Sequence, residues 1–168
     1  MAAIAVVGIA ACGDDEPERQ KNVSLDLVQA RFAERQRVAH EETMELAIRN
    51  PSDRAVEQIT ITLRPEGDGM TGAGFSASIG GAGASDTSRP VWILDKAPFN
   101  SVTADPAVFR GGPIGPGRTA RFRWQVQPVA VGEHRLHWVV GGDLRGRTRV
   151  IDAQGDPLEG TFTVTIGR

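Results

Sequence analysis

The 168-residue sequence has a single cysteine, no tyrosine, few lysines and no apolar run long enough to span a bilayer. One cysteine excludes an intramolecular disulfide, so a folded domain in this chain is held by core packing alone. A bilayer-spanning helix needs about 20 apolar residues, and no such stretch occurs. The net charge of −2 provides no bulk attraction for nucleic acid, and we expect no nucleic-acid partner.

The one cysteine, Cys12, ends a short apolar run that covers residues 1–11. Its last part, Ile9-Ala10-Ala11-Cys12, resembles the lipobox of bacterial lipoproteins, in which an aliphatic and two small residues precede the lipid-bearing cysteine. The resemblance implies a signal peptide over 1–11, cleavage before Cys12, and lipid attachment to Cys12 on the extracytoplasmic side of the cell membrane. Two or more acyl chains hold a protein firmly on a membrane, whereas one chain binds only marginally. The alternative is a free thiol buried in an apolar N-terminal strand.

A polar segment follows Cys12. Residues 13–22 read Gly-Asp-Asp-Glu-Pro-Glu-Arg-Gln-Lys-Asn, with almost nothing to bury. Such a segment does not offset the entropy of ordering it. We therefore predict a disordered tether over 12–23 and a folded domain over 24–168, a length that suits one domain with a real core.

Apolar side chains alternate with polar ones along most of the chain, which is typical of strands with one buried face. The expected inward-facing sets are Met44, Leu46 and Ile48; Ile59, Ile61 and Leu63; Phe122, Trp124 and Val126; Leu136, Trp138 and Val140; Phe162, Val164 and Ile166. A further strand is expected over 25–32, with a bulge after Leu27 because the alternation slips there. Residues 32–47 contain good helix formers, but the alternation favours strand for their second half. About seven strands separated by turns predict a two-sheet antiparallel β-sandwich.

The alternation breaks between Pro65 and Gly117. This stretch contains a glycine-rich tract with a Gly-Gly-Ala-Gly-Ala-Ser run at 80–85, then an apolar cluster at 91–94. We expect a long glycine-rich loop insertion over about 65–117, in which Pro90–Asp95 forms a strand and the glycine tract is a mobile surface loop.

Two segments carry a family resemblance. Residues 50–63, an Asn-Pro-Ser-Asp turn followed by an alternating strand, look like part of the immunoglobulin-like domains found on bacterial surfaces and in adhesion-related proteins. Gly115-Pro116-Gly117-Arg118-Thr119, the Phe122-Arg123-Trp124 strand and the Val131-Gly132-Glu133-His134 turn are similar to a later part of them. The resemblance implies a scaffold for adhesion, spacing or ligand display. The chain has neither the tyrosine corner nor the cysteine pair of antibody domains, so Trp124 and Trp138 should supply the main bulk of the core.

The sequence predicts neither a metal site nor a catalytic centre. His134 and His137 are three residues apart, and on a strand they face opposite sides. Asp152, Gln154 and Asp156 lack the glutamate that closes a calcium loop, which favours a hairpin turn. The glycine tract lacks the Lys-Ser/Thr of a phosphate-binding loop. We therefore expect no cofactor and no enzyme activity.

Two groups of residues are candidates for a ligand or partner surface. Arg121, Arg123 and Arg135, with Arg147 and Arg149, share outward parity on late strands. They either pair with Glu41, Glu45 and Glu57 across strands, or bind an anionic ligand such as cell-wall polymer or phospholipid headgroups. Trp92, Phe99 and Phe109, together with Ile93 and Leu94, either fill the core or one open end of the sandwich, or form an apolar patch or groove for a partner.

These observations favour a membrane-anchored extracytoplasmic lipoprotein that serves as a non-catalytic binding or positioning module in the cell envelope. Its expected partners are the membrane, through the lipid anchor, and a cell-wall or envelope protein component. The alternative is a periplasmic or surface carrier of a small apolar or anionic ligand that uses the 65–117 insertion as a lid or pocket.

Overall fold

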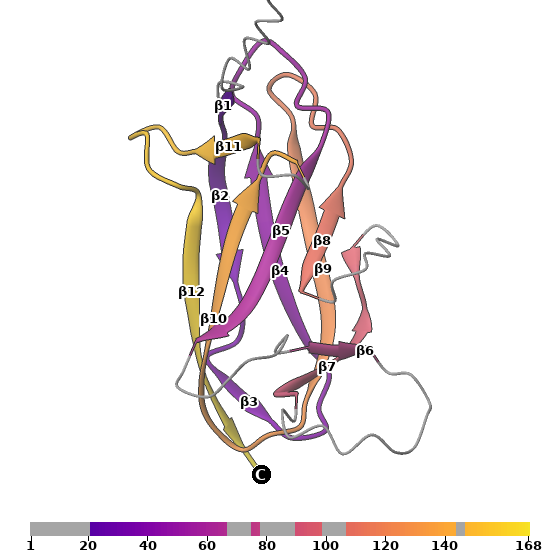
Figure 1. Cartoon of the computed structure of the whole chain (residues 1–168). Helices are drawn as coiled ribbons and strands as arrows, with labels where there is room; N and C mark the ends of the chain where they lie inside the picture. Colours follow the sequence, from indigo (N-terminus) through magenta and orange to yellow (C-terminus); the bar gives the residue numbers. More distant parts are fainter. Residues whose placement is uncertain (1–20, 67–74, 78–89, 99–106, 144–146) are drawn as a thin grey trace, which may run out of the picture.

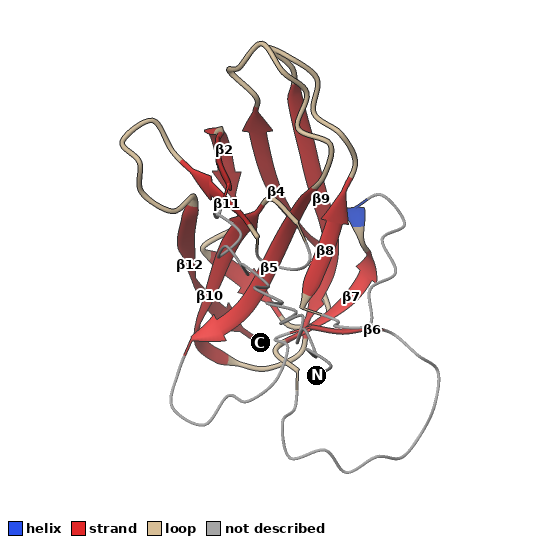
Figure 2. Ribbon diagram, turned by 45° about the horizontal axis from the view of Figure 1, so that its top comes forward, coloured by secondary structure: helices blue, strands red, loops and turns tan. Residues whose placement is uncertain are grey.

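The computed structural model describes residues 21–66, 75–77, 90–98, 107–143 and 147–168. These residues form two β-sheets stacked face to face (Figure 1). Figure 2 shows strands throughout, with one short helical turn at Pro98. The predicted all-β sandwich is confirmed.

Twelve strands make up the described fold. In chain order they are β1 (Lys21–Ser24), β2 (Asp26–Arg31), β3 (Arg35–Arg37), β4 (Glu42–Arg49), β5 (Ile59–Glu66), β6 (Phe75–Ala77), β7 (Trp92–Lys96), β8 (Val108–Gly111), β9 (Thr119–Pro128), β10 (Gly132–Gly141), β11 (Thr148–Ile151) and β12 (Glu159–Gly167).

The strand order is that of an immunoglobulin-like sandwich. The five-stranded sheet runs β2-β4-β9-β7-β6, and its first four strands occupy the places of A, B, E and D. In the seven-stranded sheet β5, β10 and β12 lie side by side in the places of C, F and G, with β8 next to β5 and β3 next to β12. Most pairings are antiparallel. The parallel exceptions are β1 with β11, β3 with β12, and β6 with β7.

The alternating residues fill the space between the sheets, as predicted. Trp124 is fully buried and Trp138 is 3% exposed, so both indoles belong to the core. Every member of the predicted inward-facing sets is buried except Phe162, which is half-buried and packs against the core. This interior replaces the disulfide that clamps the sheets in antibody domains.

The N-terminal strands differ in part from expectation. The predicted bulge in β2 is present as a register shift between Leu27 and Gln29. The boundary of the predicted tether is wrong, because Lys21–Ser24 form β1 and pair with β11. The backbone hydrogen bonds to β11 order this polar stretch, whose composition alone did not indicate a strand. Within 32–47 no helix forms, and β3 and β4 occupy this region.

The 65–117 insertion contains more sheet than expected. The predicted strand at 90–95 corresponds to β7, which pairs with β9, while Pro65 and Glu66 still belong to β5. We did not predict β8, which pairs with β5 and brings Phe109 opposite Ile61. The glycine run at 80–85 lies outside the described residues.

Two predicted turns are confirmed. Asn50, fully buried, donates from Nδ2 to the carbonyl oxygens of Arg54 at 2.7 Å and Ile114 at 2.9 Å. Its Oδ1 accepts hydrogen bonds from the backbone N and the hydroxyl of Ser52. Between β11 and β12, Oδ1 of Asp152 accepts from the backbone N atoms of Gln154 and Asp156, both at 2.9 Å, which closes a tight turn.

Candidate functional site

Two of the predicted arginines meet one glutamate on the outer face of the five-stranded sheet. Register places Glu45 on β4 directly opposite Arg123 on β9. Nη1 of Arg121 lies 2.8 Å from Oε1 of Glu45, and Nε of Arg123 lies 2.7 Å from Oε2. The cross-strand pairing expected for Glu45 is therefore present. Glu41 instead accepts a 3.4 Å hydrogen bond from Gln125, and Glu57 lies in the loop before β5.

The two arginines stabilise the charged form of Glu45. Hydrogen bonds from Arg123 and then Arg121 lower the pKa of this carboxyl below its usual value, and they outweigh partial desolvation, which acts to raise it. The Glu45 side chain is 13% exposed, whereas those of Arg121 and Arg123 are 53% and 64% exposed. Glu45 thus stays ionised and orients two guanidinium groups that remain largely in solvent.

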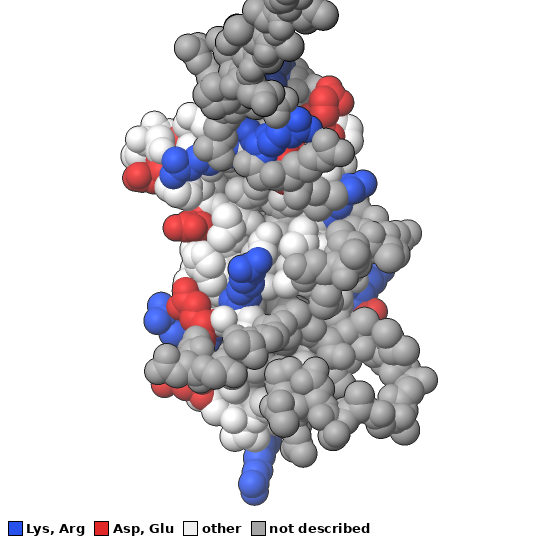
Figure 3. All heavy atoms as spheres, viewed as in Figure 1, with Lys and Arg blue, Asp and Glu red and all other residues white. Residues whose placement is uncertain are grey.

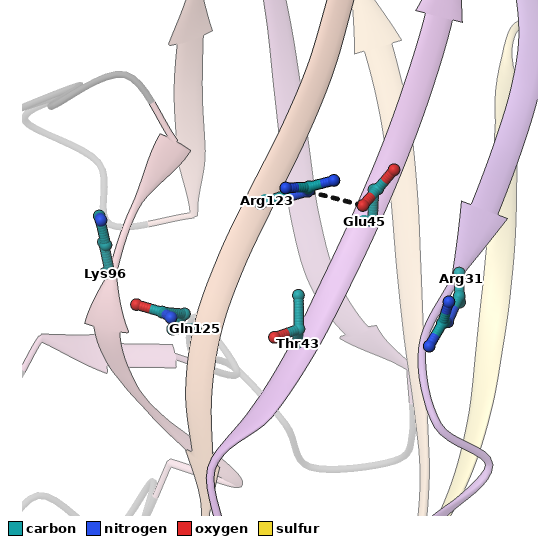
Figure 4. A pocket seen from close by; sticks show the side chains of 6 residues that line it. All are labelled: Arg31, Thr43, Glu45, Lys96, Arg123 and Gln125. Carbon is teal, nitrogen blue, oxygen red and sulfur yellow. Dashed lines mark hydrogen bonds and ion pairs between the residues drawn. The ribbon is translucent and has the colours of Figure 1, made fainter.

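These residues border an open depression of about 470 Å³ on the same face, which we call the basic depression. It is lined by Arg31, Thr43, Glu45, Lys96, Arg123 and Gln125. Figure 4 shows that β2, β4, β9 and β7 each supply part of this lining, and that Arg123 and Glu45 point toward one another. Register sets Arg31, Glu45 and Arg123 in one row across the sheet, and Thr43, Gln125 and Lys96 in the next.

The basic depression carries more positive than negative charge. Its lining has three cationic side chains and one carboxylate. In the described part of the chain, neither Arg31 nor Lys96 forms an ion pair, whereas Arg123 shares Glu45 with Arg121. A surface with excess cations held at fixed spacing can attract anionic groups without performing any reaction on them.

The third predicted arginine lies elsewhere. Arg135 is on β10, in the seven-stranded sheet, and its Nη2 lies 3.0 Å from Oε2 of Glu66. His137 lies 3.5 Å from both Glu66 and Glu159, and the Thr161 hydroxyl donates to Glu66 at 3.1 Å. Figure 3, viewed from the side of this sheet, shows charges of both signs interspersed. Arg135 therefore lies on the opposite side of the sandwich from Arg121 and Arg123, because β9 and β10 belong to opposite sheets.

The predicted apolar candidates divide between the core and the undescribed part of the chain. Trp92 is fully buried and Phe109 is 3% exposed, and Phe109 meets Trp124 edge to face with ring centroids 5.5 Å apart. Neither residue can form an exposed apolar patch. Of the two predicted alternatives, core filling or a partner surface, both residues therefore fit core filling. Phe99 lies outside the described residues, as does Cys12.

The polar groups considered for metal binding do not converge. His134 and His137 lie on opposite faces of β10: His134 Nε2 lies 3.0 Å from the Ala130 carbonyl and its ring meets Trp92, while His137 joins the Glu66 cluster. Across the described ranges, no group of three or more His, Cys, Asp or Glu side chains is placed to hold a metal ion. No helix within those ranges has the length and hydropathy to cross a bilayer.

Sequence reasoning identified Arg123 and Glu45 but missed the other residues of the basic depression. Thr43 and Gln125 share outward parity with their neighbours, so the alternation could have found them. Arg31 lies after the β2 bulge, and Lys96 follows a register shift between Leu94 and Lys96. At each of these register shifts the alternation of inward and outward side chains is interrupted, so counting every second residue along the sequence no longer predicts which face a side chain is on.

The strand pairing defines the chain as an immunoglobulin-like β-sandwich. No family model matches it, and no curated protein matches its sequence. Among solved structures, the CARDB domain of the PF1109 protein from Pyrococcus furiosus aligns with a TM-score of 0.49 and 12% identity over 85% of this chain and 87% of that one. Alpha-2-macroglobulin from Escherichia coli aligns with a TM-score of 0.49 and 12% identity over 88% of this chain and 17% of that one. Beta-glucosidase from Listeria innocua aligns with a TM-score of 0.44 and 17% identity over 86% of this chain and 16% of that one. Likeness at this level lends no ligand or activity to this chain.

Proposed function

We propose that this chain is a lipid-anchored, extracytoplasmic binding or positioning module of a bacterial cell envelope, with no catalytic role. The lipobox-like stretch that ends at Cys12 supports the anchor. The structural observation that supports a non-catalytic binding module is the filled sandwich, in which Trp92 and Phe109 occupy the core instead of a ligand cavity. A filled scaffold has its outer faces and loops available for recognition.

The chain direction suits an anchor at one end of the domain. The domain begins with β1 near the top of Figure 1, and the C-terminus lies at the opposite end. The segment from Cys12 to Lys21 reaches at most about 30 Å when fully extended. A domain anchored through Cys12 would therefore stay close to the membrane and present its sheet faces sideways to other envelope components.

The alternative is a carrier for a small ligand that uses the 65–117 insertion. A carrier of an apolar ligand loses support, because two of the three aromatic side chains expected to line its pocket are buried in the core. A carrier of an anionic ligand keeps some support, since β7 of this insertion contributes Lys96 to the basic depression. The depression is open and polar, which suits a segment of a larger ligand better than an enclosed small molecule.

The anchor is tested by feeding bacteria an alkyne-tagged fatty acid and comparing the wild-type chain with Cys12→Ser. We expect label and membrane association for the wild type, and neither for Cys12→Ser, although this variant folds normally. Ser24→Ala, a small change on β1, serves as a matched control and should label like the wild type. Equal labelling of the wild type and Cys12→Ser would refute the anchor.

A further inference from the structure

We propose that the basic depression binds the acidic groups of an anionic polysaccharide lying across β2, β4, β9 and β7. The proposal rests on the proposed function, which places the domain among envelope polymers. It adds the binding face, the chemistry of the ligand and the residues that contact it. Arg31, Arg123 and Lys96 bind the anionic groups, and Glu45 positions Arg123.

The spacing of the cations suits a polymer. Arg31, Glu45 and Arg123 occupy one row on three adjacent strands. Neighbouring strands lie about 4.8 Å apart, so the backbone positions of Arg31 and Arg123 are separated by about 10 Å. Lys96 lies in the next row, one strand beyond β9. Cations spread over this distance meet successive acidic groups of a chain better than one small anion.

Glu45 leaves the binding end of Arg123 free. The hydrogen bond to Glu45 uses Nε of Arg123, and the described structure contains no hydrogen bond from its Nη1 or Nη2. Those two nitrogens form the planar pair that binds a carboxylate or phosphate through two parallel hydrogen bonds. The Glu45 carboxylate is largely shielded and holds the guanidinium in place, while the rest of Arg123 faces solvent.

The lining favours a polysaccharide over a lipid surface. Thr43 and Gln125 supply hydroxyl and amide groups that can hydrogen-bond to sugar hydroxyls. The large apolar side chains exposed in the described ranges are Leu27, Val28, Val129 and Val131, and none of them lines the basic depression. Binding to a bilayer surface strengthens with the apolar area that inserts below the headgroups, and the lining of the basic depression contains no apolar side chain. Charge with hydrogen-bonding groups and no apolar wedge fits an acidic glycan.

The test uses the full chain carrying Cys12→Ser, so that no lipid contributes to binding. Alginate, a polymer of uronic acids, is the probe, and neutral dextran of matched length is the control polymer. We expect alginate to bind, dextran not to bind, and the affinity for alginate to fall as salt rises from 50 to 300 mM, since the attraction is screened over about 10 Å at 0.1 M. Binding of dextran as tight as that of alginate would overturn the proposal.

Two charge-matched double variants locate the surface. Arg31→Gln with Lys96→Gln should weaken alginate binding about tenfold, since each exposed ionic contact contributes a few-fold. Arg64→Gln with Arg149→Gln removes the same charge from exposed positions on the seven-stranded sheet and should change the affinity less than about twofold. Circular dichroism checks that both variants fold. Equal weakening by the two pairs would show that net charge, not this face, governs binding, and would overturn the proposal.

Glu45→Gln separates a binding face from a merely structural ion pair. The Gln side chain keeps an oxygen that can accept the hydrogen bond from Nε of Arg123, so Arg123 stays in position. Loss of the negative charge of Glu45 makes the face beside the ligand more positive by one charge, so alginate should bind about two- to fivefold more tightly. Unchanged or weaker binding by a folded Glu45→Gln chain would contradict the proposal, as would tighter binding to phosphatidylglycerol vesicles than to alginate. These results would not affect the proposed function of an anchored module, because fatty-acid labelling at Cys12 tests that proposal independently.

Discussion

The indole Nε1 of Trp92 donates a 2.8 Å hydrogen bond to Oε1 of Gln36, and both side chains are buried. Trp92 begins β7 in the five-stranded sheet, while Gln36 is the middle residue of β3 in the other sheet. Gln36 also donates from Nε2 to the carbonyl oxygen of Ala33 at 3.0 Å. A single amide therefore joins the two sheets and fixes the short strand β3 where it pairs with β12.

Replacement of Gln36 by Met, which has a similar size, should destabilise the domain by about 1–3 kcal/mol, because the buried indole N–H then lacks its acceptor. Urea unfolding followed by tryptophan fluorescence measures the loss. Gln154→Met, at an exposed position in the β11–β12 turn, is the matched control and should stay within about 0.5 kcal/mol of the wild type. A Gln36→Met chain as stable as this control would remove the sheet-joining role of Gln36.

Asn50 should be among the most sensitive polar positions in the fold. Asn50→Ala removes two donated and two accepted hydrogen bonds from a buried turn, and we expect a loss of about 2–4 kcal/mol. Asn50→Asp keeps the size and the acceptor oxygen but cannot donate to Arg54 and Ile114, so it should cost nearly as much. Asn22→Ala, on the exposed side of β1, serves as the control for asparagine loss. If Asn50→Asp unfolds like the wild type, the two donated bonds are not important.

Gly160 is required by the indole of Trp138, which lies across it from β10. A Cβ atom at position 160 would lie 2.5 Å from Cζ2 of Trp138, closer than packed atoms approach. Gly160→Ala should therefore cost about 1–3 kcal/mol through overpacking. Gly112→Ala, where the added atom meets nothing within 4 Å, is the control and should be nearly neutral in thermal unfolding. Equal melting temperatures for the two variants would show that Trp138 moves aside without cost.

The ion pairs of Glu45 make a defined contribution to pH dependence. Because the pKa of Glu45 is lowered in the folded state, its contribution to stability is present at neutral pH. That contribution is lost as the pH falls below about 4.3, the ordinary pKa of glutamate. The difference in unfolding free energy between the wild type and Glu45→Gln should therefore be larger at pH 7 than at pH 3. A difference that grows on acidification would have the wrong sign for this explanation.

The sequence predicted those parts of the fold that depend on regular alternation. The predicted inward-facing residues of β4, β5, β9, β10 and β12 follow a period of two, and all of them except the half-buried Phe162 are buried where that period puts them, although Ala47 and Thr60 of the opposite parity are buried as well. β1 and β8 were not predicted, because short strands gain their order from backbone pairing with β11 and β5 and not from side-chain pattern. The turn at Asn50 was recognisable because its side-chain chemistry is local.

The candidate site was predicted only in part, for a related reason. Arg121, Arg123 and Glu45 lie on two neighbouring regular strands, and parity was enough to place their side chains outward. Parity does not say which sheet a strand joins, so Arg135 was grouped with residues on the opposite side of the molecule. Trp92 and Phe109 differ again, because an apolar side chain in an irregular stretch fits a core and a binding patch equally well.

The lipid anchor at Cys12 is the claim on which the proposed placement of this domain depends. Intact mass spectrometry of the protein extracted with detergent from the membranes of its host tests it most directly. We predict a chain that begins at Cys12, lacks residues 1–11 and carries the added mass of at least two acyl chains on that residue. A chain that retains residues 1–11 with an unmodified Cys12 thiol would contradict the account.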